Sequence, residues 1–321
     1  MKIVIGSRGS QLALWQANWV KDQLAVDGHT IAIETIRTSG DKLQSYPPTH
    51  PLPASFAQIG AEAGTKGLFI KEIEEALLAG KVDLAVHSLK DLPTILPEGL
   101  ILAAVPPRED ARDVFISADG KPFEHLIAGA RVGTSSPRRQ TQLRRLRPDL
   151  ELIALRGNLT TRLRKLEGGD CAALVLAAAG LHRLGLRERI TGYFSIDQIC
   201  PAVGQGALAI EIRQGHAQLA LAVTRLDDLP THLAVRAERA MLRRLGGGCQ
   251  IPIAGHANFE GAQLHLRGVV ASLDGSRLIQ AVAAGSQDDP EGLGAVVAED
   301  LLAKGAREIL MIGRSGDRAI G

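Results

Sequence analysis

Short apolar runs alternate with segments of helical periodicity through the first two-thirds of this chain. An apolar run at 3–5 precedes a helical pattern, and alternating polarity follows at 31–36. A second series of the same kind starts near Asp113, with strand patterns at 131–133 and 172–176 among further helical segments. Because consecutive parallel strands require long crossover connections, which are usually helices, this alternation favours α/β units built on largely parallel sheets.

The length of the chain and a change of pattern near its end indicate three domains. At 321 residues the chain exceeds what one hydrophobic core usually organises. The α/β pattern predicts a first domain at 1–106 plus 207–224 and a second domain at 112–200. The strand pattern at 205–213 could return to the first sheet, although the sequence alone does not establish that crossing. The last part, 229–321, predicts a small α+β domain with three strand patterns between helical segments.

Charge and composition limit the partners of the chain. Hydrophobic residues make up 45% and charged residues 22%, values typical of globular proteins. The 37 Lys and Arg against 35 Asp and Glu give a net charge of +2, without the basic excess of a nucleic-acid-binding protein. No apolar segment of the sequence is long enough for a secretory signal or a membrane span. We therefore expect a cytoplasmic chain with no nucleic-acid or membrane partner, in which any anion site is local.

The clearest local signal is a helix start that carries two arginines. Ser136 is a good N-cap, Pro137 suits the first helical position, and Arg138 and Arg139 fall in the opening turn. Cations at the positive end of a helix raise the electrostatic energy unless a negative ligand arrives, so a carboxylate or phosphate site is one interpretation. A solvated basic helix is the other, and the pattern alone does not choose between them.

Further arginines follow predicted strands. Arg8, Arg156, Arg162 and Arg183 stand after strand ends or one helical turn beyond them. Since open α/β sheets bind ligands at the carboxyl ends of their strands, these side chains could converge on one crevice. Guanidinium groups bind carboxylates through paired, planar hydrogen bonds. Each arginine taken singly is more typical of a surface position.

The polar run HSLKDLP at 87–93 follows a buried strand pattern. It places Ser88, Lys90 and Asp91 at the strand end, where an acid and a base can enter the same cleft. An aspartate two residues before a proline is also typical of a turn, and on pattern alone that interpretation is favoured. We expect His87 to pack in the core.

The three cysteines have neither the pairing of a disulfide framework nor the spacing of a metal site. Cys171 and Cys200 stand beside apolar segments and are expected to be buried. Cys249 follows three glycines directly after an amphipathic helix, which predicts an accessible, reactive thiol; an incidental loop cysteine is the alternative.

Taken together, these segments resemble the porphobilinogen deaminase (hydroxymethylbilane synthase) family. The similarity covers essentially the whole chain, from GSRGSQLALWQ at 6–16 to KGAREIL at 304–310. Between these ends it lies in LAVHSLKDLP at 84–93, VGTSSPRRQ at 132–140, LRGN at 155–158, PAVGQGAL at 201–208 and ERAMLRRLGGGCQIPIAG at 238–255.

The resemblance implies a fold and a site. The fold is three domains, the first two α/β units resembling two-lobed periplasmic binding proteins and the third small and α+β. A dipyrromethane cofactor would be joined by a thioether to Cys249, and Asp91 would be the catalytic residue. The positions that match cofactor- or substrate-binding residues are Arg8, Ser10, Lys66, Ser88, Lys90, Thr134, Ser136, Arg138, Arg139, Arg156, Arg162, Arg183 and Gln205.

The resemblance also implies an activity. Such a transferase deaminates four porphobilinogen molecules, joins them head to tail on the dipyrromethane primer, and releases the linear tetrapyrrole hydroxymethylbilane by hydrolysis, in haem and porphyrin biosynthesis. It acts as a monomer on a small-molecule substrate, without a metal. The chain departs from the family pattern in places: the stretch 44–63 is longer and richer in proline, and Glu62 stands where a second cleft lysine is expected. Gly246 and Pro137 also differ from the residues common in the family, but neither touches the inferred chemistry.

Two other functions compete with this interpretation. A non-catalytic two-lobed anion sensor would use the same arginines but needs neither Asp91 nor a thiol flanked by glycine. A nucleic-acid binder built on the helix from Ser136 conflicts with the low net charge and the 3% of aromatic residues. Pyrrolic mass that remains on the purified, denatured chain would separate the transferase from both.

Overall fold

The computed structural model of the chain describes residues 1–44, 67–246 and 252–316. They fall into two compact units, which are Met1–Glu109 with Gly206–His232 and Asp110–Gln205 with Leu233–Gly321. These are called the first and the second unit, and each is described by itself. Apart from its first residue, the unusual stretch at 44–63 lies outside the described residues.

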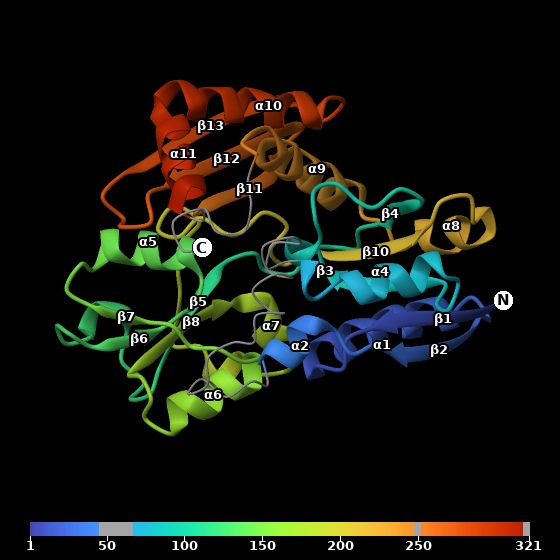
Figure 1. Cartoon of the computed structure of the whole chain (residues 1–321), viewed down its shortest axis with the longest axis horizontal. Helices are drawn as coiled ribbons and strands as arrows, with labels where there is room; N and C mark the ends of the chain where they lie inside the picture. Colours follow the sequence, from blue (N-terminus) through green and yellow to red (C-terminus); the bar gives the residue numbers. More distant parts are fainter. Residues whose placement is uncertain (45–66, 247–251, 317–321) are drawn as a thin grey trace. The chain divides into compact units, whose positions relative to one another are not determined.

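The first unit is built on a five-stranded sheet in the order β2-β1-β3-β10-β4 (Figure 1). Its strands are β1 (Lys2–Ser7), β2 (Thr30–Thr35), β3 (Leu84–Ser88), β4 (Leu100–Ala104) and β10 (Leu208–Arg213). Its helices are α1 (Gln11–Ala25), α2 (Ser39–Gln44), α4 (Lys71–Leu78) and α8 (Ala217–Thr224), with a short 3₁₀ helix η1 (Leu89–Asp91).

Both faces of this sheet are covered by helices. β1 runs parallel to β2 and β3, whereas β10 runs antiparallel to β3 and β4. α1 and α8 pack on the face that carries Leu84 and Ile210, and α4 packs on the opposite face against Ala85. β3 is therefore buried on both sides, and its first partly exposed residue is Ser88 at its end. The expected return of the chain to the first sheet is confirmed, because β10 pairs with β3 and β4.

The second unit contains a sheet of the same plan, in the order β7-β6-β8-β5-β9. Here β6 runs parallel to β7 and β8, while β5 runs antiparallel to β8 and β9. Its strands are β5 (Asp113–Ser117), β6 (Arg131–Gly133), β7 (Glu151–Ile153), β8 (Ala173–Ala177) and β9 (Gly192–Tyr193). Its helices are α5 (Pro137–Leu146), α6 (Leu159–Glu167) and α7 (Ala178–Arg183), with 3₁₀ helices η2 (Phe123–His125) and η3 (Arg187–Arg189).

Side-chain caps fix where the helices of this sheet begin. The Ser136 side chain accepts a hydrogen bond from the backbone N–H of Arg139, and Pro137 occupies the first turn, as expected from the sequence. Asn158 caps α6 in the same way by accepting from Thr161 N. Each cap satisfies a backbone donor that a helix start leaves without a partner, so both helices start where their arginines stand in or near the first turn.

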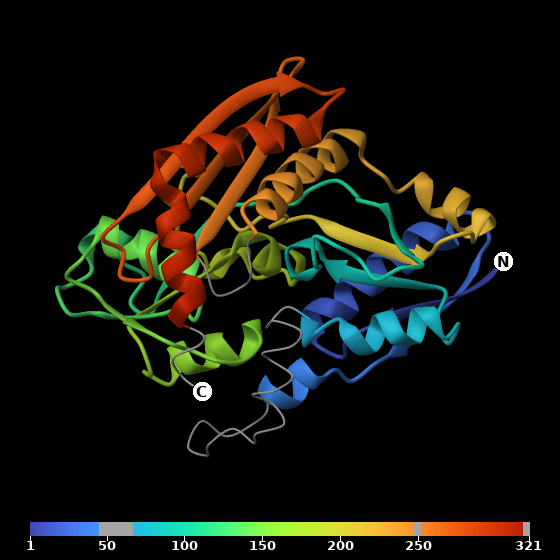
Figure 2. The ribbon, with the colours of Figure 1, turned by 45° about the horizontal axis from the view of Figure 1, so that its top comes forward.

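The rest of the second unit is an antiparallel three-stranded sheet with helices on it (Figure 2). Its elements are α9 (Leu229–Arg244), β11 (Ile253–Glu260), β12 (Gln263–Ala271), β13 (Leu278–Ser286), α10 (Pro290–Leu301), the π-helical turn η4 (Leu302–Ala306) and α11 (Arg307–Gly316). α10 lies along β12 and β13, and Met241 of α9 shares its core with Val297 and Leu301 of α10. The cap of α10 is Asp289, whose side chain accepts from Gly292 N, and Pro290 occupies the first turn.

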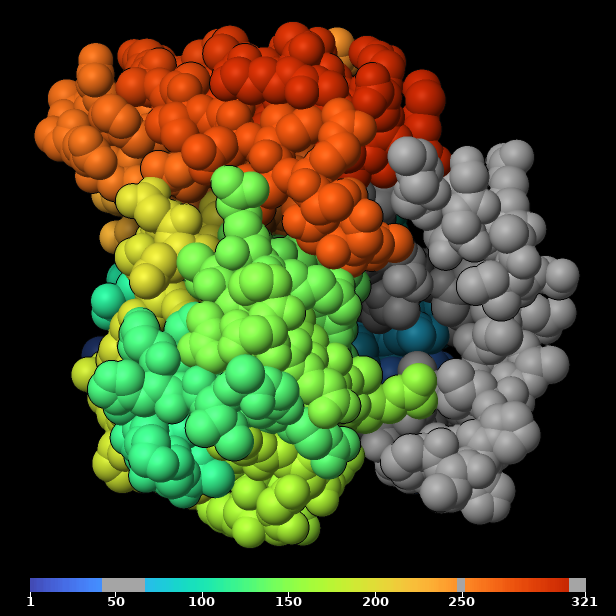
Figure 3. Space-filling view, turned by 90° about the vertical axis from the view of Figure 1, so that its left-hand side faces the viewer, coloured from blue at the N-terminus to red at the C-terminus, as the bar shows by residue number. Residues whose placement is uncertain are grey.

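The two parts of the second unit are in direct contact. Figure 3 shows the surface of the 110–205 part, in green, meeting that of the β11–β13 sheet, in orange. Gly255 N donates to Pro201 O at 3.0 Å, and Arg144 Nη1 donates to Leu273 O at 2.9 Å. Buried Cys200, Ala254 and Val269 form a small apolar cluster at this junction.

The expected fold class is confirmed by these sheets: two α/β units of like plan and a small α+β part. The three domain boundaries given above stay predictions. Within the described residues, no helix has both the length and the apolar character needed to cross a membrane.

Candidate functional site

The two arginines at the start of α5 are buried around one carboxylate. Arg138 and Arg139 are each 6% exposed and Asp113, the first residue of β5, is 0% exposed. Arg138 Nη1 donates to Asp113 Oδ2 at 2.7 Å, whereas Arg139 Nε and Nη2 both donate to Asp113 Oδ1, at 3.0 and 2.7 Å. The solvated basic helix is therefore excluded for these two side chains.

Backbone carbonyls and a glutamine complete this network. Arg138 Nη1 also donates to Cys200 O at 2.6 Å, and Arg139 Nη1 donates to Val175 O at 3.1 Å. Gln205 Nε2 donates to Asp113 Oδ1 at 2.9 Å and to Ala111 O at 2.7 Å. Both guanidinium groups are thus held rigidly, which is what a preorganised anion site requires.

A third arginine, Arg162 in the first turn of α6, adds positive charge. Its Nε donates to the carbonyl of Gly157 at 3.0 Å, in a turn where Gly157 has φ +119°, a conformation that favours glycine. Burial, together with the positive charge of Arg139, lowers the pKa of Arg162 to about 10. Arg162 stays charged at neutral pH, but an additional anion would stabilise it.

These charges do not balance within the described contacts. We call Arg138, Arg139, Arg162 and Asp113 the arginine cluster. Burial raises the pKa of Asp113, but the charges and hydrogen bonds of Arg138 and Arg139 outweigh this and hold it far below its ordinary value, so the carboxyl is ionised. Arg138 and Arg139 then share one anion beside the positive end of α5, and Arg162 adds a third positive charge close enough to Arg139 for their like charges to interact. The surplus charge suits a ligand with carboxylates.

The other expected binding residues of the second unit differ in exposure. Thr134 is buried just before α5 and its hydroxyl accepts from Ser136 N at 3.3 Å. Arg183 is 8% exposed at the end of α7, and Arg156 is exposed. Ser136, Gln205 and Thr134 therefore belong to the framework around the arginine cluster, while the Arg156 side chain is open to solvent.

In the first unit, the expected residues stand at the ends of β1 and β3. Arg8 follows β1 and pairs with Asp41 at 2.5 Å, and its guanidinium lies 4.1 Å from the centre of the Phe69 ring. Burial raises the pKa of Asp41, but hydrogen bonds from Arg8 and Thr38 bring it below its ordinary value. Ser10 is the N-cap of α1 and accepts from Ala13 N.

The segment 88–92, which we call the Asp91 turn, is held at both ends. Ser88 Oγ accepts from Gln16 Nε2 at 2.9 Å. Leu89 and Leu92 are buried, and Leu92 N donates to Leu89 O across η1 at 3.0 Å. Asp91 itself is half-buried, and no described residue hydrogen-bonds its carboxylate. Lys90 lies beside it in the same short helix.

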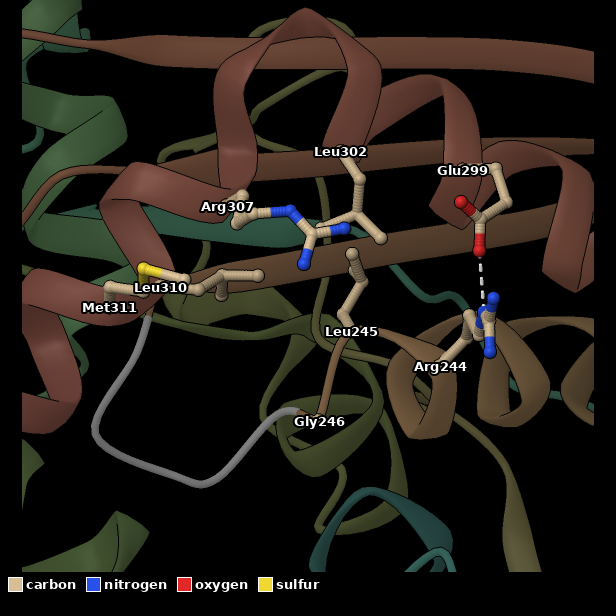
Figure 4. Close-up of a pocket in the computed structure, with 8 residues that line it drawn as sticks. All are labelled: Arg244, Leu245, Gly246, Glu299, Leu302, Arg307, Leu310 and Met311. Atoms are coloured by element: carbon tan, nitrogen blue, oxygen red, sulfur yellow. Dashed lines mark hydrogen bonds and ion pairs between the residues drawn. The ribbon is translucent and has the colours of Figure 1, made fainter.

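Cys249 and Lys66 lie outside the described residues. The described residue before that part of the chain, Gly246, lines a cavity of about 290 Å³ (Figure 4). Its walls combine apolar side chains, such as Leu245 and Leu310, with charged ones: the guanidinium of Arg307 extends into it, and Arg244 pairs with Glu299 at 2.5 Å. The other two cysteines are buried as expected, and burial raises the pKa of the Cys200 thiol to about 12.

Comparisons with known proteins decide the family. A family model described as porphobilinogen deaminase, dipyromethane cofactor binding domain, matches residues 3–221, and one described as porphobilinogen deaminase, C-terminal domain, matches 232–303. The chain belongs to the porphobilinogen deaminase family. Curated porphobilinogen deaminases of Syntrophotalea carbinolica and Desulforudis audaxviator are each 50% identical to it, over 95% and 98% of this chain and 94% and 99% of their own.

Solved structures give more distant matches. The methionine binding protein MetQ covers 70% of this chain and 89% of its own, at 12% identity and a TM-score of 0.45. An ancestral arginine-binding protein bound to arginine covers 70% and 90%, at 13% identity and a TM-score of 0.37. The resemblance to porphobilinogen deaminases expected from the sequence is confirmed, and a dipyrromethane is the cofactor that the first family model names.

Sequence reasoning missed the acidic partners of the porphobilinogen deaminase site residues. Asp113 holds two of the arginines and Asp41 holds Arg8. For Asp113 a signal was present, because aspartate is rare in strands and rarely buried without a partner, yet it stands directly before the apolar run Val114 to Ile116. For Asp41, in a short polar helix, the sequence carries no comparable signal.

Proposed function

We propose that this chain is a porphobilinogen deaminase that joins four porphobilinogen molecules head to tail on a dipyrromethane primer and releases hydroxymethylbilane by hydrolysis. The observation that carries the proposal is the arginine cluster, in which Arg138 and Arg139 share the carboxylate of Asp113 and Arg162 adds a third positive charge near Arg139. A chain of carboxylate-bearing pyrroles supplies the missing negative charge. A non-catalytic anion sensor would retain none of the chemistry assigned below.

The residues present fit the cofactor. Arg138 and Arg139 are fixed by Asp113, and Arg162 lies close enough for the charge of Arg139 to lower its pKa, so carboxylates bound here are met by prearranged donors. Cys249 is the proposed thioether attachment. The bound dipyrromethane supplies the nucleophilic carbon on which the chain grows. Thr134, Ser136, Arg156, Arg183 and Gln205 complete the proposed cofactor- and substrate-binding residues of the second unit.

Asp91 is the proposed catalytic residue. Its half-buried carboxylate accepts no hydrogen bond from the described residues, so it can accept them from pyrrole N–H groups and stabilise positive charge that develops there. The same carboxylate can move a proton during loss of ammonia and during restoration of aromaticity. Arg8, Ser10, Lys66, Ser88 and Lys90 are the proposed binding residues of the first unit. We further propose that the chain acts in the cytoplasm as a monomer, without a nucleic-acid, membrane or metal partner.

Covalent mass tests the attachment. The purified wild-type chain, denatured, should keep a pyrrolic adduct by intact mass and absorbance. Cys249→Ser should lose both the adduct and activity, whereas Cys171→Ser and Cys200→Ser are matched controls that should keep the adduct. A wild-type chain without an adduct would favour the anion sensor, and an adduct on Cys249→Ser would move the attachment elsewhere.

Single-turnover release of ammonia tests Asp91. Asp91→Asn keeps the size of the side chain but removes its charge, so adduct-loaded protein should release ammonia at least about 100-fold more slowly. Asp91→Glu keeps the charge but displaces it, so its loss should be smaller. Wild-type rates in Asp91→Asn would make Asp91 a turn residue only.

A further inference from the structure

Three titratable side chains are buried together in the first unit, behind the strand that carries the Asp91 turn. His87 of β3 is 5% exposed, Glu211 of β10 is 0% exposed and Glu74 of α4 is 9% exposed. We call them the buried acid cluster. None of the three is used by the proposed chemistry.

The geometry joins two strands that are distant in sequence. In the antiparallel ladder His87 is opposite Ala209 and Ala85 is opposite Glu211, so His87 and Glu211 project from the same face of the sheet, toward α4. His87 Nε2 lies 3.1 Å from Glu211 Oε2. Glu211 Oε1 and Glu74 Oε1 are buried, and neither has a hydrogen-bond partner among the described residues.

The electrostatics make this cluster sensitive to pH. Burial, then the charges of Glu211 and Glu75, raise the pKa of Glu74 to about 7. The strands packed on α4 are β1, β3, β4 and β10. Besides His87 and Glu211, these strands and the residue before β3 carry three charged side chains, and β4 carries none. Lys2 is exposed. Arg213 donates to Leu77 O and Val82 O and pairs with Asp83, which precedes β3.

The cluster is coupled to the Asp91 turn through the backbone. His87 directly precedes Ser88, and the ladder between β3 and β10 continues beyond it, where Leu89 N donates to Ala207 O at 3.0 Å. The turn then closes between two buried leucines. A change in the contact between His87 and Glu211 therefore shifts the backbone four residues before Asp91. The intervening segment is fixed by the ladder and by two buried leucines, so the shift is transmitted to the Asp91 carboxylate.

We propose that His87, Glu211 and Glu74 are positioning residues that hold β3 against β10 and so fix the place of the Asp91 turn. The proposal rests on the proposed function, because it takes Asp91 as the group positioned. When Glu74 ionises, an uncompensated negative charge is buried beside Glu211, and β3 holds the Asp91 turn less firmly.

Stability against pH tests the cluster without any assay of activity. The unfolded-state pKa of Glu74 is near 4.5 and the folded-state pKa is about 7, so the folded chain keeps a proton that the unfolded chain releases. The contribution of Glu74 to stability therefore falls as pH rises from 4.5 and levels off above 7. Glu74→Gln should remove this loss of stability. The urea midpoint of Glu74→Gln minus that of wild type should therefore increase as pH rises between these two values. Asp22→Asn, at an exposed position of α1 in the same unit, is the matched control and should run parallel to wild type.

The pH profile of kcat tests positioning. Glu74→Gln should move the alkaline fall of kcat to higher pH by at least about half a unit and leave KM for porphobilinogen within about twofold. Glu211→Gln should lower kcat about tenfold or more at a similar KM, as a displaced catalytic group does. Asp22→Asn should reproduce the wild-type profile.

Each result decides one part of the proposal. Parallel stability curves of Glu74→Gln and wild type would overturn the cluster. If the stability curve of Glu74→Gln changes but its kcat profile does not, the cluster affects stability only and does not position the Asp91 turn. A wild-type chain that does not turn over porphobilinogen would overturn the proposed function and the positioning role with it, while the stability curves would still decide whether the cluster exists.

Discussion

At the scale of single residues, the carboxylate of Asp113 accounts for the placement of two guanidinium groups. We expect Asp113→Asn to lower the free energy of unfolding by about 3 kcal/mol at neutral pH, because it leaves Arg138 and Arg139 buried without their counter-charge. Urea denaturation measures the loss. Because folding lowers the pKa of Asp113, its carboxylate contributes its full stabilisation above the unfolded-state pKa of 3.8. The difference in free energy of unfolding between wild type and Asp113→Asn should therefore narrow only below that pH.

A surface aspartate of the same part of the chain provides the control. Asp149 pairs with Arg147 at 2.6 Å but is exposed. Asp149→Asn should change the free energy of unfolding by less than about 1 kcal/mol, as is usual for exposed ion pairs. Equal effects of the two substitutions would mean that the arginine cluster depends on its bound ligand and not on Asp113.

The cation half of this cluster was predictable, whereas its anion half was not. Two arginines after a Ser-Pro helix start conflict with the helix dipole, and this conflict is visible within four residues. Their partner, Asp113, lies 25 residues before Arg138, on strand β5, and only the fold brings it next to the two arginines. Sequence patterns report local electrostatic conflicts, but they do not report which distant group resolves them.

At the scale of elements, the junction between α9 and the turn before β10 depends on one buried acid. Glu238 of α9 accepts from Gly204 N at 2.7 Å and from Ala257 N at 2.8 Å. We expect Glu238→Ala to lower the free energy of unfolding by about 2 to 4 kcal/mol, since two buried backbone donors lose their acceptor. Glu299→Ala, which breaks only the exposed pair with Arg244, should cost less than about 1 kcal/mol.

Elements with local signals were predicted and those that depend on pairing were not. The helix from Pro137 begins with a cap and a proline signal and was found where expected, and α10 begins with the same two signals at Asp289 and Pro290. β9 has only two residues, and its sequence is not distinctive. It exists because Val114 and Phe115 of β5 pair with it, which is a long-range effect that no window of sequence contains.

At the scale of the whole molecule, a nearly neutral chain carries a concentrated positive charge. The net charge of +2 conceals the arginine cluster, because the acids that balance it elsewhere are spread over the chain. The position of β10 also could not be derived from the sequence alone. The sequence indicates a strand at 205–213, but only the pairing of β10 with β3 and β4 shows which sheet it joins. Whole-chain averages such as net charge therefore do not locate the site.

The surplus charge has a consequence for the chain without its cofactor. Protein produced in a host that makes no porphobilinogen should carry the surplus positive charge of the arginine cluster with no ligand to compensate it. Two charge-assisted hydrogen bonds to cofactor carboxylates are worth about 3 kcal/mol or more, so this protein should unfold at least about 5 °C below the adduct-loaded form. Thermal unfolding of both forms measures the difference.

Sulfate should raise the Tm of the cofactor-free form more than that of the loaded form, whereas chloride at equal ionic strength should not, because a divalent oxyanion can occupy the guanidinium donors that are open when the cofactor is absent. Equal responses of the two forms to sulfate would mean that the arginines bind no anion and that the surplus charge is balanced within the protein itself.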